Sequence, residues 1–148
     1  MADDILKVER QPNYVTLTLN RPEKRNSLNQ ALLEAFDKAL ISLENDKEIR
    51  AVILRGAGKA FCAGLDLAEA DRLEGGHSPV SIERVFHRLE QFPVPTIAAV
   101  QGAALAGGCE LALHCDLRVA AEDARIGMTV ARLGLLVPYD FIRKLIEV

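Results

Sequence analysis

The sequence lacks a long hydrophobic run. No stretch reaches the roughly 18 consecutive apolar residues that a membrane-spanning helix requires. The N-terminus begins Met-Ala-Asp-Asp, and it lacks the basic and apolar regions of a signal peptide. These absences argue against the membrane and secreted classes of protein. We therefore expect a cytoplasmic protein with no membrane partner.

Cysteine is scarce as well. The three cysteines, Cys62, Cys109 and Cys115, are odd in number and have no spacing typical of zinc or redox sites. We interpret them as reduced thiols, which suits a cytosolic protein. The three histidines share no ligand spacing either, so we expect no metal site.

An excess of positive charge is also missing. The 18 lysines and arginines are outnumbered by 21 acidic residues, and both signs are interspersed along the chain. This balance argues against a nucleic-acid partner. The stretch around Gly56 and Gly58 only superficially resembles a phosphate-binding loop, because Ile53 replaces its first glycine and Ala60 its Ser/Thr. We expect no nucleotide cofactor.

Apolar periodicity predicts strands alternating with helices, which is typical of an α/β architecture. The expected strands are 5–10, 14–19, 52–54, 96–100 and 117–120, and the expected helices are 28–44, 81–91, 107–114 and 140–148. A turn containing glycine and proline is expected at 75–79. Residues 1–148 contain no repeat or linker, and we interpret them as one domain. The last helix lacks a capping signal, so we expect an interrupted domain, a fragment rather than a naturally short paralogue.

Two stretches share one pattern, in which a strand is followed by small residues and then by a helix start. They are FCAGLDL (61–67) and QGAALAGGCELALHCD (101–116). The first N–H groups of a helix lack partners and carry partial positive charge. Gly107 and Gly108 have no Cβ that would keep a ligand away from them. If Leu65 and Gly107 point their N–H groups at one spot, they form an oxyanion hole, which suits a thioester enolate.

Glu110 lies in the first turn of the helix expected at 107–114. Apolar neighbours would raise its pKa if it is buried, and the carboxyl could then move a proton near neutral pH. On the pattern alone, packing is the commoner explanation of such turns. A glutamate in a first helical turn is usually a surface residue that the helix dipole favours.

Three blocks of sequence favour the catalytic explanation over the packing explanation. LNRPEKRNSLN (19–29), AVILRGAGKAFCAGLDL (51–67) and AAVQGAALAGGCELALHCDLRVAAEDARIG (98–127) together resemble the enoyl-CoA hydratase/isomerase family, the crotonase superfamily. The resemblance covers about residues 5 to 148. It implies a crotonase-like spiral of ββα units whose C-terminal helical region is missing here. It also implies an acyl-CoA thioester substrate and a homotrimer or hexamer. Coenzyme A is then part of the substrate, and no cofactor is expected.

The resemblance also assigns roles to residues. The backbone N–H groups of Leu65 and Gly107 match the two oxyanion-hole donors, and Glu110 matches the first of two glutamates in typical hydratases. The residues matched to substrate or coenzyme A contacts are Arg25, Ala63, Gly64, Asp66, Leu67, Gly108 and Val130. Arg25 is equally well explained as a solvated loop cation.

Val130 is a departure from the family pattern, because it falls where the second hydratase glutamate is expected. Hydration is usually described with two carboxyls, so a double-bond isomerase that uses Glu110 alone becomes more plausible. Asp140 could reach the pocket, but we interpret it as a helix N-terminal acid. The sequence therefore predicts an enoyl-CoA hydratase. An isomerase and a non-catalytic acyl-CoA-binding member are the alternatives.

Overall fold

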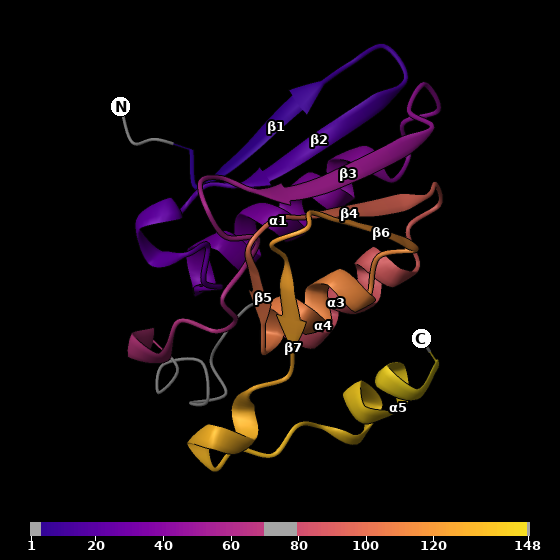
Figure 1. Ribbon diagram of the computed structural model, residues 1–148. Coiled ribbons are helices and arrows are strands. Elements are labelled where there is room, and N and C mark those ends of the chain that lie inside the picture. The colour runs from indigo at the N-terminus through magenta and orange to yellow at the C-terminus, as the bar shows by residue number, and fades with distance from the viewer. Residues whose placement is uncertain (1–3, 70–79, 148) are drawn as a thin grey trace.

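The computed structural model describes residues 4–69 and 80–147, which form two sheets with helices packed around them (Figure 1). The turn expected at 75–79 lies outside the described residues. The larger sheet has the spatial order β1-β2-β3-β4-β6. Its strands are β1 (Leu6–Arg10), β2 (Tyr14–Leu19), β3 (Ala51–Gly56), β4 (Thr96–Val100) and β6 (Leu117–Ala120).

The first two strands form the expected hairpin, and every later strand of the larger sheet is parallel to β2. Parallel strands are usually buried on both faces and read as continuous apolar runs. In β2 the apolar residues alternate instead: Val15, Leu17 and Leu19 share one face of the sheet and are fully buried, with threonines between them. The core of the molecule therefore lies against this sheet.

A second, smaller layer runs beside the larger sheet. It contains the parallel strands β5 (Ala103–Leu105) and β7 (Arg125–Gly127). Single parallel bridges extend it, from Cys62 to Ala104 and from Leu65 to Leu28. Each turn of the chain thus adds one strand to the larger sheet and one short extended segment to the smaller layer. This arrangement confirms the expected spiral.

Helices complete the turns of the spiral. They are α1 (Gln30–Leu43), α3 (Ile82–Glu90), α4 (Gly107–Leu113) and α5 (Tyr139–Glu147), with 3-10 turns η1 (Pro22–Lys24) and η2 (Val130–Leu133). Side-chain oxygens of Asn29 and Ser81 cap α1 and α3 by accepting backbone N–H bonds. Both helices pack their apolar faces into the main core.

The expected elements are largely confirmed, with differences at their ends. Helix α1 begins at Gln30 instead of residue 28, because Leu28 is held in the bridge to Leu65 and Asn29 serves as the cap. Strands β5 and β7 were not expected, since three-residue strands leave no readable alternation. The three cysteines are free and buried.

Helix α5 lies beyond α4, away from the larger sheet (Figure 1). Its one buried side chain, Phe141, packs with Cys109 and Leu113 of α4 in a small separate cluster. An ion pair of 2.6 Å from Lys144 to Glu90 joins α5 to α3. Within the described ranges, no helix is long and apolar enough to cross a membrane.

Candidate active site

Two loops meet at the amino end of α4. A Cβ placed on Gly107 would lie 3.5 Å from the Gly64 Cα and 3.6 Å from the Leu65 nitrogen. The backbone N–H groups of Leu65 and Gly107, from two turns of the spiral, are therefore neighbours. The sequence predicts that these two residues lie together, and the fold does bring them together.

The bridge between Leu28 and Leu65 explains why the Leu65 N–H is free. In this bridge the Leu28 N–H donates to the Gly64 carbonyl at 2.7 Å, and the Asp66 N–H donates to the Leu28 carbonyl at 2.9 Å. The residue between two such bonds directs its own N–H to the opposite edge. Among the residues that the structure describes, the Leu65 N–H has no backbone or side-chain acceptor.

The Gly107 N–H is free for a different reason. Gly107 is the first residue of α4, and the first N–H groups of a helix have no acceptor within it. No acceptor for it occurs elsewhere in the described part of the chain. Two unpaired donors thus lie side by side, next to the partial positive charge of a helix start.

Unusual backbone angles precede both donors. Gly64 has a φ of 98°, and Ala106 has a φ of 51° with a ψ of −122°. A positive φ is costly for alanine, and such strain persists only where surrounding contacts enforce it. Here the Ala106 N–H donates to the Gly127 carbonyl, and its own carbonyl accepts from the Glu110 N–H. The local fold therefore fixes the direction of the Gly107 N–H.

Gly108 has a packing role. A Cβ on Gly108 would lie 2.0 Å from the Cys62 carbonyl oxygen, which is an impossible contact. The absence of a side chain thus lets the start of α4 approach the strand-to-loop segment at Cys62. The sequence predicts that the missing Cβ leaves room for a ligand, and the geometry shows that the approach of the two loops requires it as well.

Glu110 lies on the first turn of α4, and its carboxyl is partly buried. Burial, assisted by the negative charge of Glu83, raises the pKa of Glu110 to about 7. Its backbone carbonyl accepts from the His114 N–H and lies 2.8 Å from His114 Nδ1. A carboxyl with this pKa can both hold and release a proton near neutral pH, which is what general acid–base catalysis requires.

Comparison with known proteins places the chain in a family. The family profile described as Enoyl-CoA hydratase/isomerase matches residues 9–146, which is most of the sequence. The chain belongs to this family.

Its relatives carry matching names. The chain is 42% identical to a short-chain-enoyl-CoA hydratase of Clostridium acetobutylicum over 132 residues, which are 86% of this chain and 51% of that protein. It is 46% identical to a putative enoyl-CoA hydratase of Thermus thermophilus over 124 residues, which are 80% of this chain and 49% of that protein. The chain spans about half the length of these relatives.

A solved structure agrees with the fold. An enoyl-CoA hydratase/carnithine racemase of Magnetospirillum magneticum superposes with a TM-score of 0.91 at 30% identity. The match covers 99% of this chain and 57% of that one. The hydratase/isomerase fold therefore accounts for nearly every described element.

In this family member, the loop that follows β3 is held by hydrogen bonds within the chain. The Asp66 carboxylate accepts from Arg21 at 2.9 Å and from the Ala68 N–H, and the Arg21 bond lowers the pKa of Asp66. Helical structure begins only at Leu67, because Leu65 is held in its bridge. The Ala63 N–H donates to the Arg25 carbonyl. The side chains of Arg25 and Leu67 point outward and are exposed.

Val130 and Asp140 lie on separate elements. Val130 is half-buried and begins the 3-10 turn η2, so no carboxyl occupies that position. Asp140 stands in the first turn of α5, as expected for a helix N-terminal acid. It also lines a cavity of about 400 Å³ that Glu110 lines from α4.

Sequence reasoning missed Glu83 and His114, which line the same cavity. His114 packs against Phe86 with ring centroids 5.3 Å apart, and burial lowers its pKa. Its spacing of four residues from Glu110 was a readable signal, because residues i and i+4 share one face of a helix. No comparable signal linked Glu83 to Glu110, since they lie on different turns of the spiral.

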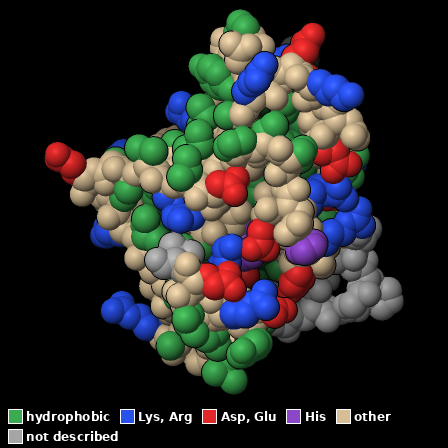
Figure 2. Space-filling model, turned by 90° about the vertical axis from the view of Figure 1, so that its right-hand side faces the viewer, with side chains coloured by type: hydrophobic (Ala, Val, Ile, Leu, Met, Phe, Trp, Pro, Cys, Tyr) green, Lys and Arg blue, Asp and Glu red, His purple; other side chains and the backbone are tan. Residues whose placement is uncertain are grey.

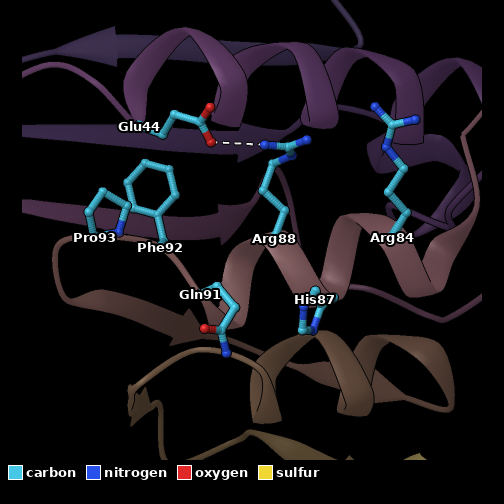
Figure 3. A pocket seen from close by; sticks show the side chains of 7 residues that line it. All are labelled: Glu44, Arg84, His87, Arg88, Gln91, Phe92 and Pro93. Carbon is cyan, nitrogen blue, oxygen red and sulfur yellow. Dashed lines mark hydrogen bonds and ion pairs between the residues drawn. The ribbon is translucent and has the colours of Figure 1, made fainter.

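A second cavity, of about 290 Å³, lies between α3 and the end of α1 (Figure 3). Arg88 projects into it and is paired with Glu44 at 2.8 Å and with Asp37 at 2.9 Å. Arg84 also pairs with Asp37. Because its arginines are already neutralised, this cavity is a weak candidate for binding an anion. Across residues 4–69 and 80–147, no group of His, Cys, Asp and Glu could hold a metal ion.

Glu110 should make the free energy of unfolding depend on pH. Its pKa of about 7 in the folded chain exceeds the ordinary value of 4.5, so folding favours the protonated form. The resulting stabilisation is complete below about pH 4 and is lost as the pH rises through about 7. We expect the unfolding free energy of the wild type minus that of Glu110→Gln to fall between about pH 5 and pH 8. Urea denaturation at a series of pH values measures this difference, and a flat difference would contradict burial of the carboxyl.

Proposed function

We propose that the protein is an enoyl-CoA hydratase, which adds water to the double bond of a 2-enoyl-CoA thioester. The observation that carries the proposal is the pair of unpaired N–H groups at Leu65 and Gly107, one helical turn from Glu110. Two such donors stabilise negative charge on a carbonyl oxygen. A carboxyl with a pKa of about 7 supplies or removes a proton at the neighbouring carbon.

The chemistry follows from the thioester. When water adds at C3, the electrons of the C2–C3 double bond move toward the thioester oxygen, which becomes an enolate oxygen. Because the Leu65 and Gly107 N–H groups are neighbours, we place this oxygen where it accepts a hydrogen bond from both. The enolate is then protonated at C2. Both donors are backbone groups held by strained or bridged residues, so they are in place before the charge develops.

The coenzyme A part of the substrate is assigned to the loop after β3. We place coenzyme A along Ala63, Asp66 and Leu67, with Arg25 available for its phosphates. Coenzyme A is part of the substrate, and we propose no separate cofactor. We further propose that the protein works in the cytoplasm as a homotrimer or a hexamer. The names of relatives support an acyl-CoA substrate.

Isomerisation is the second candidate, and Val130 favours it. Shifting a double bond from C3 to C2 needs one carboxyl that removes a proton from one carbon and returns it to another. Glu110 alone could do this, and the position of Val130 offers no second acid.

The test is incubation with a panel of 2-enoyl- and 3-enoyl-CoA esters that differ in acyl length. The products are read by mass and by chromatographic retention, because an isomer has unchanged mass. We expect the mass of one water to be gained from 2-enoyl esters. A retention shift at constant mass would establish an isomerase instead. No reaction with any ester of either kind would overturn both candidates.

A further inference from the structure

Hydration moves two protons, and the position occupied by Val130 supplies no carboxyl for the second one. A second carboxyl must then come from elsewhere in the fold. The cavity of about 400 Å³ beside Glu110 is lined by side chains from α3, α4 and α5. Figure 2 shows acidic, basic and histidine side chains gathered in one region of this side of the molecule.

The acids of this cavity differ in their partners. Glu90 is bound to Lys144, which lowers the pKa of Glu90, and Glu147 pairs with Arg143. Glu83 makes no ion pair with any residue that the structure describes. Asp140 makes none either, but it lies on α5 and does not contribute to the pKa of Glu110.

Glu83 lines the same cavity as Glu110, from the first turn of α3. It follows Ile82, whose Cδ1 lies 3.7 Å from the position of a Cβ on Gly107. The first turn of α3 therefore lies beside the two free N–H groups. Burial is the main cause of the raised pKa of Glu110, and among the described residues the negative charge of Glu83 adds to it. Two carboxyls near one cavity, with one of them holding a proton near pH 7, are typical of an acid and base pair.

We propose that Glu83 is the second carboxylate of the active site and accepts the proton of the water that adds to the double bond. This inference rests on the proposed hydratase function. The helix N-terminus at α3 favours the negative charge that a base must carry. Glu110 in its protonated form is then the acid that serves C2.

The step balances. An O–H bond of water breaks, its proton goes to Glu83, and the oxygen forms a bond to C3. The π electrons of the C2–C3 bond move into the enolate, whose oxygen accepts the Leu65 and Gly107 N–H groups. The enolate carbon C2 then takes the proton of Glu110. Transfer of one proton from Glu83 to Glu110 through solvent restores both groups.

The test compares Glu83→Gln with Asp140→Asn, because both changes neutralise an exposed acid of the same cavity without changing its size. Two reactions are measured for each variant. One is hydration of a four-carbon 2-enoyl-CoA, and the other is exchange of the C2 hydrogens of the saturated four-carbon acyl-CoA in D2O. Exchange needs Glu110 and the two N–H donors, but it adds no water and needs no second base.

We expect Glu83→Gln to lower the kcat of hydration about a hundredfold, while exchange stays within a few-fold of the wild type. Asp140→Asn should leave both reactions nearly unchanged. Unchanged hydration in Glu83→Gln, or loss of exchange together with hydration, would overturn the role of Glu83. So would loss of hydration in Asp140→Asn alone. If the wild-type protein catalyses neither hydration of the 2-enoyl-CoA nor exchange of the C2 hydrogens, the proposed function itself is overturned. This outcome is distinguishable from failure of the Glu83 proposal, in which the wild type is active.

Discussion

Replacing Glu110 by glutamine should lower the kcat of the wild-type reaction by about a thousandfold. Glutamine keeps the size of the side chain but neither takes up nor releases a proton at neutral pH. General acid–base catalysis typically contributes 10²- to 10⁴-fold, and Glu110 is the carboxyl whose pKa of about 7 suits that task. Binding of the acyl-CoA should change by a few-fold at most, because the Leu65 and Gly107 N–H groups remain.

The measurement pairs steady-state kinetics with calorimetric titration of a non-reacting acyl-CoA. Glu122→Gln is the matched control, since it makes the same change at an exposed position between β6 and β7. Turnover of Glu110→Gln within tenfold of the wild type would remove Glu110 from the chemistry. Loss of binding together with turnover would show that the change damaged the site as a whole.

The sequence predicted the components of this site better than their arrangement. The strands and helices that carry Leu65, Gly107 and Glu110 follow from apolar periodicity and from the small residues that interrupt it. The shared pattern of the two stretches raised the meeting of Leu65 with Gly107 as a hypothesis, and the family resemblance made it an expectation. The meeting depends on the bridges from Leu28 to Leu65 and from Cys62 to Ala104, and single bridges leave no local pattern.

Other features depend on contacts between turns of the spiral. The sequence predicts that Gly108 leaves room for a ligand, but it does not reveal that a Cβ there would lie 2.0 Å from the Cys62 carbonyl oxygen. Glu83 had no signal in the sequence, because its relation to Glu110 arises from the packing of α3 over α4. The positive φ of Ala106 could not be predicted from the sequence, since alanine seldom adopts one. Sequence patterns report local structure, whereas these features are set by long-range packing.

Replacing Gly107 by proline should lower kcat by a factor of about 10² to 10³, which corresponds to roughly 2.7–4 kcal/mol of lost oxyanion stabilisation. Proline has no N–H, so this change deletes one of the two donors and nothing else from the hydrogen-bonding groups. The first position of a helix tolerates proline, because its N–H has no partner within the helix. Glu110 remains in place, and the site keeps its proton carrier.

Gly107→Ala is the matched control, because alanine keeps the N–H. Its Cβ would meet no atom closer than 3.5 Å, which is an ordinary contact. Kinetics and thermal unfolding are measured for both variants. If the N–H is the oxyanion donor, the proline variant loses turnover while it remains folded, and the alanine variant keeps its turnover; some loss of melting temperature is expected for proline, because its ring restricts the backbone of Ala106. If both variants lose turnover equally, the effect arises from added bulk between the loops, and the Gly107 N–H is not the group that stabilises the transition state.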